Sequence, residues 1–208
     1  MNRYVSDAVI RRLPGYYRHL RELETAGVTH ISSQQLGERM QCTASQIRQD
    51  INSFGSFGRQ GVGYDVADLK NHIAQILGLD QDHHLIIIGA GNIGRAVASY
   101  PAFNKSGFLI SGIFDADISK VGQAVGGLTV MNISELPAFV KNNRIDIGVL
   151  AVPANAAQKS LDLLVGNGIC AVWNFAPTDL VHDSRVTVVN VHLSESLQIL
   201  SYKMKNGK

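Results

Sequence analysis

The sequence has little cysteine, and this scarcity excludes two classes of protein. Among 208 residues there are two cysteines, Cys42 and Cys170, and they form no Cys-x-x-Cys pair. Disulfide-framed secreted domains and structural zinc sites need several cysteines at short spacings. The seven histidines show no metal-ligand spacing either. We therefore expect reduced cysteines and no metal site.

Long hydrophobic runs and a strong excess of charge are also absent. No stretch approaches the roughly 18 consecutive apolar residues that a membrane helix needs, and the first residues lack the layout of a secretory signal. A cytoplasmic protein with no membrane partner is expected. The net charge of +2 is by itself a weak indication of nucleic-acid binding. Arginine supplies eight of the nine basic residues before residue 79, a bias that suits contacts with phosphate and guanine.

What the sequence does have is a glycine motif between a strand and a helix. The apolar run at 85–88 leads into Gly-x-Gly-x-x-Gly, and a helix-forming segment follows. In dinucleotide-binding folds these glycines permit a tight turn, close approach of backbone to pyrophosphate, and close packing of helix on strand. The cofactor-binding residues expected here are Gly89, Ala90, Gly91, Asn92, Ile93, Gly94 and Arg95.

Asp115 strengthens this interpretation because it ends the next predicted strand, 21 residues after Gly94. A carboxylate at that place accepts hydrogen bonds from the hydroxyls of an adenosine ribose, and no arginine adjoins it to bind a 2′-phosphate. NAD(H) is therefore expected in preference to NADP(H). The alternative is an aspartate that only caps a turn.

Alternating strands and helices indicate a doubly wound parallel sheet over residues 79–192. We expect strands at 84–88, 109–114, 128–131, 145–151, 169–175 and 186–191, and helices at 92–100, 134–141 and 155–166. Ligands bind such sheets at the carboxyl ends of the strands. The nicotinamide half of the cofactor is therefore expected beside Ala151, Val152, Pro153 and Phe175, although these could equally be plain strand ends.

The first 78 residues have a different pattern, typical of a DNA-binding head. Helices are expected at 6–13, 14–26, from Ser32 or Ser33 to Met40, at 44–53 and at 66–77. Two short helices across a three-residue turn, the second capped by Thr43, form a helix-turn-helix. A glycine-rich hairpin at 53–64 would then be a wing, unless its glycines only satisfy turn geometry.

The second helix of this pair has an apolar stripe of Ile47, Ile51 and Phe54, so its other side faces outward. Hydrogen-bonding side chains there suit base edges, and arginine suits guanine or phosphate. The alternative is an ordinary solvated face. The DNA-binding residues expected on the helix and the wing are Thr43, Ser45, Gln46, Arg48, Gln49, Asn52, Arg59 and Gln60.

Residues 193–208 are expected to form a final helix, capped by Ser194, that serves dimerisation. Leu193, Leu197, Leu200 and Met204 repeat at steps of four, three and four, which makes one apolar stripe. The stripe packs either on the chain's own sheet or on a second copy. A two-fold dimer also suits a helix-turn-helix protein that reads two half-sites.

Catalysis is not expected. The dinucleotide domain leaves no room for a substrate domain, and no Tyr-x-x-x-Lys pair occurs. Tyr100 and His192 are possible proton donors, but no partnered acid–base set surrounds them. Two alternatives to a redox-responsive regulator stay open: a DNA-binding regulator gated by another nucleotide such as coenzyme A, and a small dehydrogenase.

Taken together, the chain resembles the Rex family of redox-sensing transcriptional repressors of Gram-positive-type bacteria. The motifs that carry the resemblance run along nearly the whole chain: Arg12-Leu13-Pro14-x-Tyr16-Tyr17-Arg18, Ser32-Ser33-x-x-Leu36, Gln46-Ile47-Arg48-x-Asp50, Phe54-Gly55-Ser56-Phe57-Gly58-x-x-Gly61-Val62-Gly63-Tyr64-x-Val66, Gly89-Ala90-Gly91-Asn92-x-Gly94-Arg95, Asn174-Phe175-Ala176-Pro177 and Leu193-Ser194. The resemblance implies a homodimer that binds a palindromic operator in double-stranded DNA, with a C-terminal helix swapped between subunits.

The same resemblance implies release from DNA by NADH and opposition by NAD⁺, with Tyr100 and His192 near the nicotinamide. Two positions depart from the family pattern. Relatives commonly have arginine or lysine where this chain has Gln60, and many have aspartate where it has His192. In those relatives the aspartate helps to link the redox state to Tyr100 and Arg18, so that network is an open question in this chain.

Overall fold

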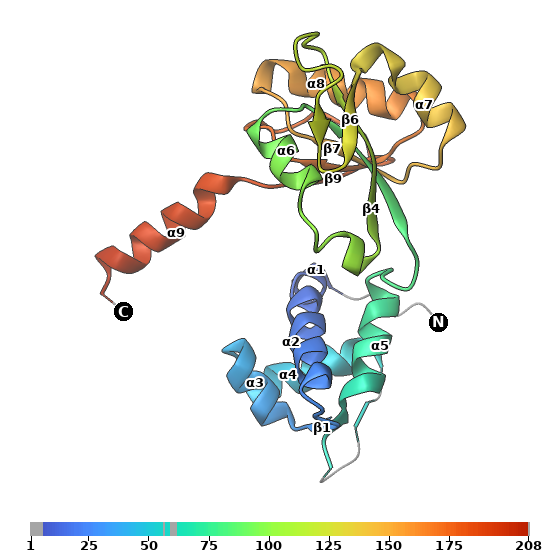
Figure 1. Cartoon of the computed structure of the whole chain (residues 1–208). Coiled ribbons are helices and arrows are strands. Elements are labelled where there is room, and N and C mark those ends of the chain that lie inside the picture. Colours follow the sequence, from blue (N-terminus) through green and yellow to red (C-terminus); the bar gives the residue numbers. More distant parts are fainter. Residues whose placement is uncertain (1–5, 56, 59–61, 208) are drawn as a thin grey trace. The chain divides into compact units, whose positions relative to one another are not determined.

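The computed structural model describes residues 6–55, 57–58 and 62–207. The chain folds as two compact units, Met1–Gln81 and Asp82–Lys208 (Figure 1). The division falls three residues after the boundary expected from the sequence, and the C-terminal helix belongs to the second unit.

The first unit is mainly helical. Its elements are α1 (Asp7–Ile10), α2 (Leu13–Thr25), β1 (His30–Ile31), α3 (Ser33–Met40), α4 (Ala44–Phe54), β2 (Tyr64–Asp65) and α5 (Val66–Ile76). The first helix is shorter than the sequence predicted, because a turn at Arg11 and Arg12 separates it from α2. Pro14 stands in the first turn of α2, where a missing N–H costs no helical hydrogen bond.

Helices α3 and α4 form the predicted helix-turn-helix. The Ser32 hydroxyl accepts a hydrogen bond from the Gln35 N–H, and the Thr43 hydroxyl accepts one from the Gln46 N–H, so both helices have N-caps. The turn between them places Gln41 in the left-handed region, with φ of 55°. Gly37 lies under this turn, where a Cβ would be only 2.6 Å from the Cys42 carbonyl oxygen.

The core of the first unit lies between α2, the helix-turn-helix and α5. Ile47 and Ile51 of α4 are fully buried and Phe54 is half-buried, which confirms the predicted inner stripe of this helix. They pack with side chains from the other helices: Leu13, Tyr16, Leu20, Leu36, Leu69 and Ile73. Burial of these apolar surfaces is the main source of the unit's stability.

The segment expected to form a wing is described only in part. The described residues at 55, 57–58 and 62–63 have no strand assignment except an isolated bridge at Gly63. Strand β2 pairs antiparallel with β1, with Tyr64 opposite Ile31. Arg59 and Gln60, two expected DNA contacts, lie outside the described residues.

The second unit has the predicted α/β architecture. Its elements are β3 (His83–Ile88), α6 (Asn92–Ala98), a 3-10 turn (Asn104–Ser106), β4 (Phe108–Asp115), β5 (Ala124–Val125), β6 (Leu128–Asn132), a 3-10 turn (Ile133–Glu135), α7 (Leu136–Asn142), β7 (Ile147–Leu150), α8 (Ala154–Gly166), β8 (Ala171–Asn174), β9 (Thr187–Asn190) and α9 (Leu193–Lys205). Strand β5 was not expected from the sequence. It is two residues long and forms a hairpin with β6.

The strands follow the order β5-β6-β4-β3-β7-β8-β9, and all but β5 are parallel. Counted along the parallel strands, this is the 3-2-1-4-5-6 order of the Rossmann fold. Ile86 and Ile88 of β3 pack in the cluster that includes α7 and α8, whereas Leu85 and Ile87 pack with α6 on the other face. The order reverses between β3 and β7, which is where such sheets bind ligands.

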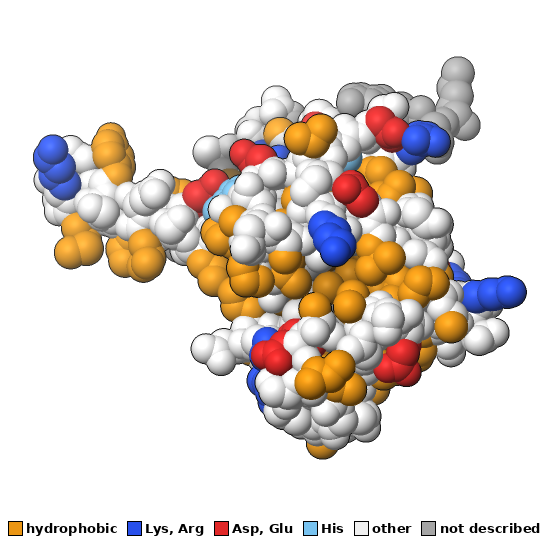
Figure 2. Space-filling model, turned by 90° about the horizontal axis from the view of Figure 1, so that it is seen from above, with side chains coloured by type: hydrophobic (Ala, Val, Ile, Leu, Met, Phe, Trp, Pro, Cys, Tyr) orange, Lys and Arg blue, Asp and Glu red, His pale blue; other side chains and the backbone are white. Residues whose placement is uncertain are grey.

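Helix α9 is exposed along its whole described length. None of its described residues is buried, and Leu197 is 66% exposed. Figure 2 shows hydrophobic side chains gathered along this helix, which extends to the left of the view. Its N-cap is His192 and not Ser194 as the sequence suggested, because the helix already begins at Leu193. Across the described residues, none of the helices combines the length and the apolar character needed to cross a bilayer.

Candidate functional site

A deep cleft lies at the reversal of strand order, and the glycine motif forms its floor. Gly89 follows β3 with φ of 104°, and a Cβ there would clash with the Ala151 carbonyl. A Cβ on Gly94 would clash with the Gly89 carbonyl, so this glycine lets α6 pack tightly on the loop. A Cβ on Gly91 would meet no atom within 4 Å. The first and third glycines are thus required by packing, while the second leaves space for a ligand.

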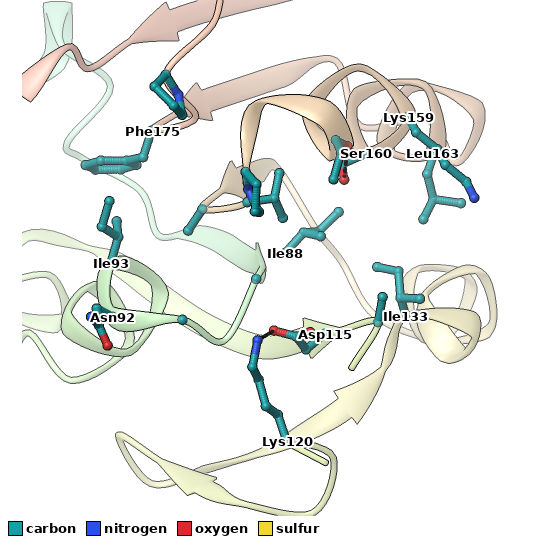
Figure 3. Close-up of a pocket in the computed structure, with 18 of the residues that line it drawn as sticks. Ile88, Asn92, Ile93, Asp115, Lys120, Ile133, Lys159, Ser160, Leu163 and Phe175 are labelled. Atoms are coloured by element: carbon teal, nitrogen blue, oxygen red, sulfur yellow. Dashed lines mark hydrogen bonds and ion pairs between the residues drawn. The ribbon is translucent and has the colours of Figure 1, made fainter. Parts of the chain in front are cut away.

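The cleft has a volume of about 1000 Å³ (Figure 3), which matches the size of cofactor sites. Nine predicted cofactor residues line it: Gly89, Gly91, Asn92, Ile93, Asp115, Ala151, Val152, Pro153 and Phe175. They come from β3, α6, β4, the end of β7 and the end of β8. Residues nearly ninety positions apart therefore meet at one edge of the sheet, as the parallel topology requires.

Asp115 is the buried anionic group of the cleft, with 8% of its surface exposed. Its Oδ2 accepts hydrogen bonds from the Ala90 N–H at 2.7 Å and from Lys120 Nζ at 3.0 Å. Its Oδ1 accepts the Asp117 N–H at 2.8 Å. The carboxylate thus joins the glycine loop to the end of β4.

These contacts keep Asp115 ionised. Burial alone raises the pKa of a carboxyl group, but the backbone N–H groups of Asp117 and Ala90 and the ammonium group of Lys120 outweigh burial and hold the pKa below its usual value. One hydrogen bond to Oδ1 occurs among the described residues, and a carboxylate oxygen accepts two. An acceptor position therefore remains for a ligand hydroxyl.

Lys120 is a site residue that the sequence analysis missed. Its ammonium group pairs with Asp115 and stands at the cleft wall (Figure 3). Its sequence position gave one indication, because Lys120 follows the strand-ending Asp115 by only five residues. A loop this short keeps the lysine near the carboxyl edge of the sheet. Lys120 supplies a cation beside the expected ribose. The residues directly next to Asp115 include no arginine, so they gave no indication of this cation.

The far wall of the cleft was also missed. Ile133 precedes α7, and Lys159, Ser160 and Leu163 lie on α8 (Figure 3). This wall is apolar between Ile133 and Leu163, with a hydroxyl and an ammonium group beside it. Such a surface suits a flat aromatic base such as adenine. The sequence placed α8 correctly but gave no signal for which of its faces lines the cleft.

Five predicted cofactor residues do not line the cleft: Ala90, Gly94, Arg95, Tyr100 and His192. Ala90 and Gly94 support the loop from behind. Arg95 turns back, and its Nε donates to the Ala90 carbonyl at 2.9 Å. His192 Nε2 lies 3.8 Å from an Asp179 carboxylate oxygen.

Tyr100 lines a second hollow of about 510 Å³, whose wall is almost entirely apolar. Phe103, Phe108, Trp173 and Val189 line it too. A row of aromatic rings connects the two hollows, with ring centroids 4.9 Å apart for Tyr100 and Phe103, 5.8 Å for Phe103 and Trp173, and 4.5 Å for Trp173 and Phe175. Phe175 stands in the cleft (Figure 3).

The predicted nucleic-acid face of the first unit is exposed on α4 and at its cap. The exposed residues are Thr43, Ser45, Arg48, Gln49 and Asn52. Arg48 Nη1 donates to the Ser33 hydroxyl at 3.0 Å, which holds its guanidinium group beside the start of α3. Gln46 differs from the expectation of an outward contact, because its amide Nε2 donates to the Asp50 carboxylate at 2.7 Å.

Comparison with known families agrees with this division into two units. A family described as "Putative DNA-binding protein N-terminus" matches residues 4–52, and one described as "CoA binding domain" matches residues 80–178. The first match spans α1 to α3 and most of α4, and the second spans the Rossmann-like unit from β3 to β8.

Individual relatives match nearly the whole chain. A redox-sensing transcriptional repressor Rex of Clostridium botulinum (strain Alaska E43 / Type E3) is 50% identical over 98% of this chain and 97% of its own length. One of Thermoanaerobacter sp. (strain X514) is 51% identical over 96% of this chain and 89% of its own length.

Solved structures extend the likeness to the backbone. The crystal structure of RSP in complex with beta-NAD+ and operator DNA has a TM-score of 0.92 at 50% identity, covering 98% of this chain and 94% of RSP. The structure of RSP with beta-NADH has a TM-score of 0.89 at 48% identity, covering 97% and 95%. With a shared fold and about half of its residues identical along nearly its full length, the chain belongs to the Rex family of redox-sensing transcriptional repressors.

Proposed function

We propose that this protein is a transcriptional repressor that binds operator DNA through α4 and senses the ratio of NADH to NAD⁺ in the cleft at Asp115. The observation that carries the proposal is the pairing of an exposed helix-turn-helix with a Rossmann cleft in one chain. Each half agrees with a complex known for the relative RSP, which binds operator DNA and both forms of the cofactor. The relatives are named as regulators and not as enzymes.

In the first unit, the DNA contacts are assigned to α4 and its cap. Ser45, Gln49 and Asn52 present hydrogen-bonding groups suited to base edges, and Arg48 suits guanine or phosphate. Thr43, at the start of α4, is assigned to a contact with a backbone phosphate. Arg59 and Gln60 are assigned to the same interface as wing contacts.

In the second unit, the cleft is assigned to NAD(H). The adenosine ribose binds Asp115 and Lys120, the adenine lies between Ile133 and Leu163, and the nicotinamide lies toward Phe175. A buried carboxylate disfavours the 2′-phosphate of NADP(H) by charge repulsion, which Lys120 reduces but does not remove because it is already paired. Tyr100 and His192 act, on this proposal, only in the assembled protein, since neither lines the cleft of one chain.

NAD⁺ and NADH differ by one hydride, so only groups near the nicotinamide distinguish them. The oxidised ring is cationic and the reduced ring is neutral. An apolar surround such as Phe175 penalises the cation. To move a two-state dimer from 1:99 to 99:1 needs about 5.5 kcal/mol of differential binding, so two cofactors in one dimer would supply roughly 2.7 kcal/mol each.

A homodimer completes the proposal. The stripe of Leu193, Leu197, Leu200 and Met204 on α9 is at least half exposed at every position, and a free apolar stripe of this size marks an interaction surface. We propose that two copies of the chain exchange residues 193–208, so that each subunit's C-terminal helix packs on the other subunit. The resulting dimer presents two helix-turn-helix units to the two halves of a palindromic site. We also propose that the protein acts in the cytoplasm, where both DNA and the free dinucleotide occur.

The test begins with a duplex selected by the protein from random-sequence DNA. Its binding is titrated by fluorescence anisotropy with NADH, NAD⁺, NADPH and coenzyme A. NADH should weaken binding, NAD⁺ should oppose NADH, and coenzyme A should have no effect. Unchanged DNA affinity at saturating NADH would contradict the proposal, and an effect of coenzyme A alone would favour a regulator gated by that nucleotide.

Two further measurements separate the two functions. Trp173 is the single tryptophan and stacks edge-on against Phe175 of the cleft, so its fluorescence reports cofactor binding independently of DNA. Arg48→Ala should cost about 1–3 kcal/mol of specific DNA binding and leave the Trp173 response to NADH unchanged. The reverse result would mean that α4 does not present Arg48 to DNA.

A further inference from the structure

Helix α4, to which we assign the DNA contacts, contains a fully buried negative charge. Asp50 is 1% exposed, while Gln49 beside it and Arg48 are exposed. A buried carboxylate is expensive unless donors surround it. Its presence on the helix that faces DNA therefore needs an explanation.

Donors surround this carboxylate completely. Arg12 binds it with two prongs, from Nε to Oδ2 at 2.6 Å and from Nη2 to Oδ1 at 2.8 Å. The Tyr16 hydroxyl donates to Oδ2 at 2.8 Å, and Gln46 Nε2 donates to Oδ1 at 2.7 Å. Each oxygen thus has two donors, which fills the acceptor capacity of the group.

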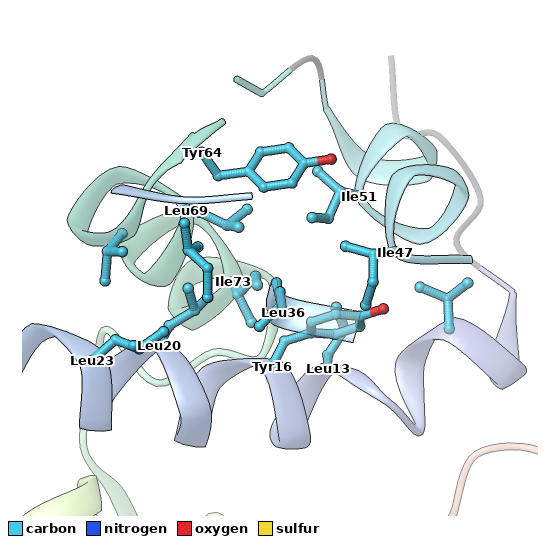
Figure 4. Packing of buried hydrophobic residues seen from close by; sticks show 13 residues of the cluster. Leu13, Tyr16, Leu20, Leu23, Leu36, Ile47, Ile51, Tyr64, Leu69 and Ile73 are labelled. Atoms are coloured by element: carbon cyan, nitrogen blue, oxygen red, sulfur yellow. The ribbon is translucent and has the colours of Figure 1, made fainter. Parts of the chain in front are cut away.

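The donors fix α4 against α2. Arg12 is the N-cap of α2 and Tyr16 lies in its first turns, so three charge-assisted bonds join the two helices. Figure 4 shows Tyr16 beside Ile47 in the apolar cluster between these elements. Apolar contacts such as this one are non-directional, whereas a two-pronged guanidinium–carboxylate pair has a defined plane.

The ionisation states support this geometry. Burial raises the pKa of Asp50, but the hydrogen bonds from Arg12, Gln46 and Tyr16 outweigh burial and hold the pKa below its usual value. Burial and the bond to Asp50 raise the pKa of Tyr16, so its hydroxyl stays protonated and continues to donate.

We propose that Asp50 is a positioning residue for operator recognition: bound by Arg12 and Tyr16, it sets the rotation of α4 so that Arg48 and Gln49 face the base edges. This inference rests on the proposed DNA binding by α4. A purely stabilising role does not explain why this pair is present. The Asp50 side chain is buried while that of Arg12 is 35% exposed, and a protein in which apolar groups of similar volume replace such a pair is often no less stable. Directional bonds add what apolar packing lacks, namely one defined orientation of the helix.

The test separates orientation from stability with two variants. Asp50→Leu alone leaves the Arg12 guanidinium and the Tyr16 hydroxyl without their acceptor, so both folding and DNA binding should suffer. The triple variant Arg12→Met, Tyr16→Phe, Asp50→Leu removes the acceptor together with both of its donors on the α2 side, and only the Gln46 amide, at the edge of α4, loses a partner. Thermal unfolding of the first unit should then recover toward the wild-type midpoint.

DNA binding of the triple variant distinguishes a role of Asp50 in orienting α4 from a role in stability alone. Affinity is measured for the duplex selected by the wild-type protein and for a scrambled duplex of equal composition. Operator affinity should stay reduced by about tenfold or more, the cost of a misread base pair, with unchanged affinity for the scrambled duplex and an unchanged Trp173 response to NADH. Recovery of operator affinity along with stability would overturn the proposal.

Arg12→Lys provides a third variant should the triple variant not fold. It keeps the positive charge beside Asp50 but loses the two-pronged bond. Operator affinity should fall while affinity for the scrambled duplex holds. Equal affinities to those of the wild type, or a parallel loss on both duplexes, would overturn the proposal. Failure of the proposed function is distinguishable, because the wild-type protein itself would then select no duplex.

Discussion

At the scale of single residues, Asp115 joins the structure of the glycine loop to the proposed recognition of the cofactor. It receives two backbone N–H groups and the Lys120 ammonium group while one acceptor position stays open. Asp115→Ala should therefore weaken NADH binding by about 1.5–3 kcal/mol, the value of hydrogen bonds to a charged group. Titration of Trp173 fluorescence with NADH measures the change.

The neighbouring carboxylate offers a matched control for that substitution. The Asp117 side chain is half exposed and lies 3.9 Å from Lys120, so Asp117→Ala removes a charge near the cleft without opening it. NADH affinity should then be nearly unchanged, as for most exposed ion pairs. Operator affinity in the absence of cofactor should stay intact in both variants. Loss of operator binding in Asp115→Ala would show that the residue is structural.

Residue positions were predictable from sequence where backbone spacing fixes them. Asp115 follows from the distance to Gly94 along a strand–helix–strand unit, and Gly89 from the turn that the unit requires. Lys120 and Gln46 were not predictable in the same way, since the path of a loop or the rotation of a helix decides whether each side chain reaches its carboxylate. The periodicity of apolar residues predicts which side of α4 faces the core. It does not predict that the side chain of Gln46, at the edge of that side, turns toward Asp50.

At the scale of elements, the turn between α3 and α4 depends on a glycine in a helix. A Cβ on Gly37 would meet the Cys42 carbonyl oxygen at 2.6 Å, and backbone cannot move aside cheaply. Gly37→Ala should push the two helices apart and destabilise the first unit by about 1–3 kcal/mol, as overpacking does. Thermal unfolding followed by circular dichroism measures the loss.

Gly15→Ala is the control within the same unit. Its Cβ would meet only Met40 Cε, at 3.3 Å, the mobile end of a flexible side chain. Alanine is favoured over glycine in helices by up to about 1 kcal/mol, so the midpoint temperature of thermal unfolding should stay the same or rise. If Gly15→Ala lowered the unfolding midpoint as much as Gly37→Ala, close packing at the turn between α3 and α4 would not be the cause of the destabilisation.

Element boundaries followed the sequence most closely where caps and glycines mark them. Thr43 caps α4 as expected, and the Asp65 side chain caps α5, which begins at residue 66 as predicted. The edge strand β5 escaped notice because two residues carry no periodicity. Ser194 was mistaken for a cap because its type favours that position, yet the helix begins one residue before it.

At the scale of the whole molecule, α9 is the element that the isolated chain leaves unexplained. Sequence periodicity correctly gave its apolar stripe, but a pattern cannot say which surface covers it. The described residues of the chain cover none of it. On the proposed function, a second copy covers the stripe and supplies the two-fold symmetry that a palindromic operator needs.

This assignment leads to a prediction about assembly. Leu197 is 66% exposed and stands in the stripe, and its burial in a dimer would contribute about 1.5–3 kcal/mol per subunit. Leu197→Glu removes that contribution and adds a charge that an apolar interface rejects. Sedimentation velocity should show a shift from dimer to monomer, with operator affinity falling in parallel because one head reads one half-site.

Gln198→Glu introduces the same charge at the next residue, which lies off the stripe at about 100° per residue. It should leave the sedimentation coefficient and operator binding as in the wild type. The comparison thus separates the apolar stripe from the total charge of α9. A dimer that survives Leu197→Glu would place the contact between subunits elsewhere and leave the exposed stripe without a partner.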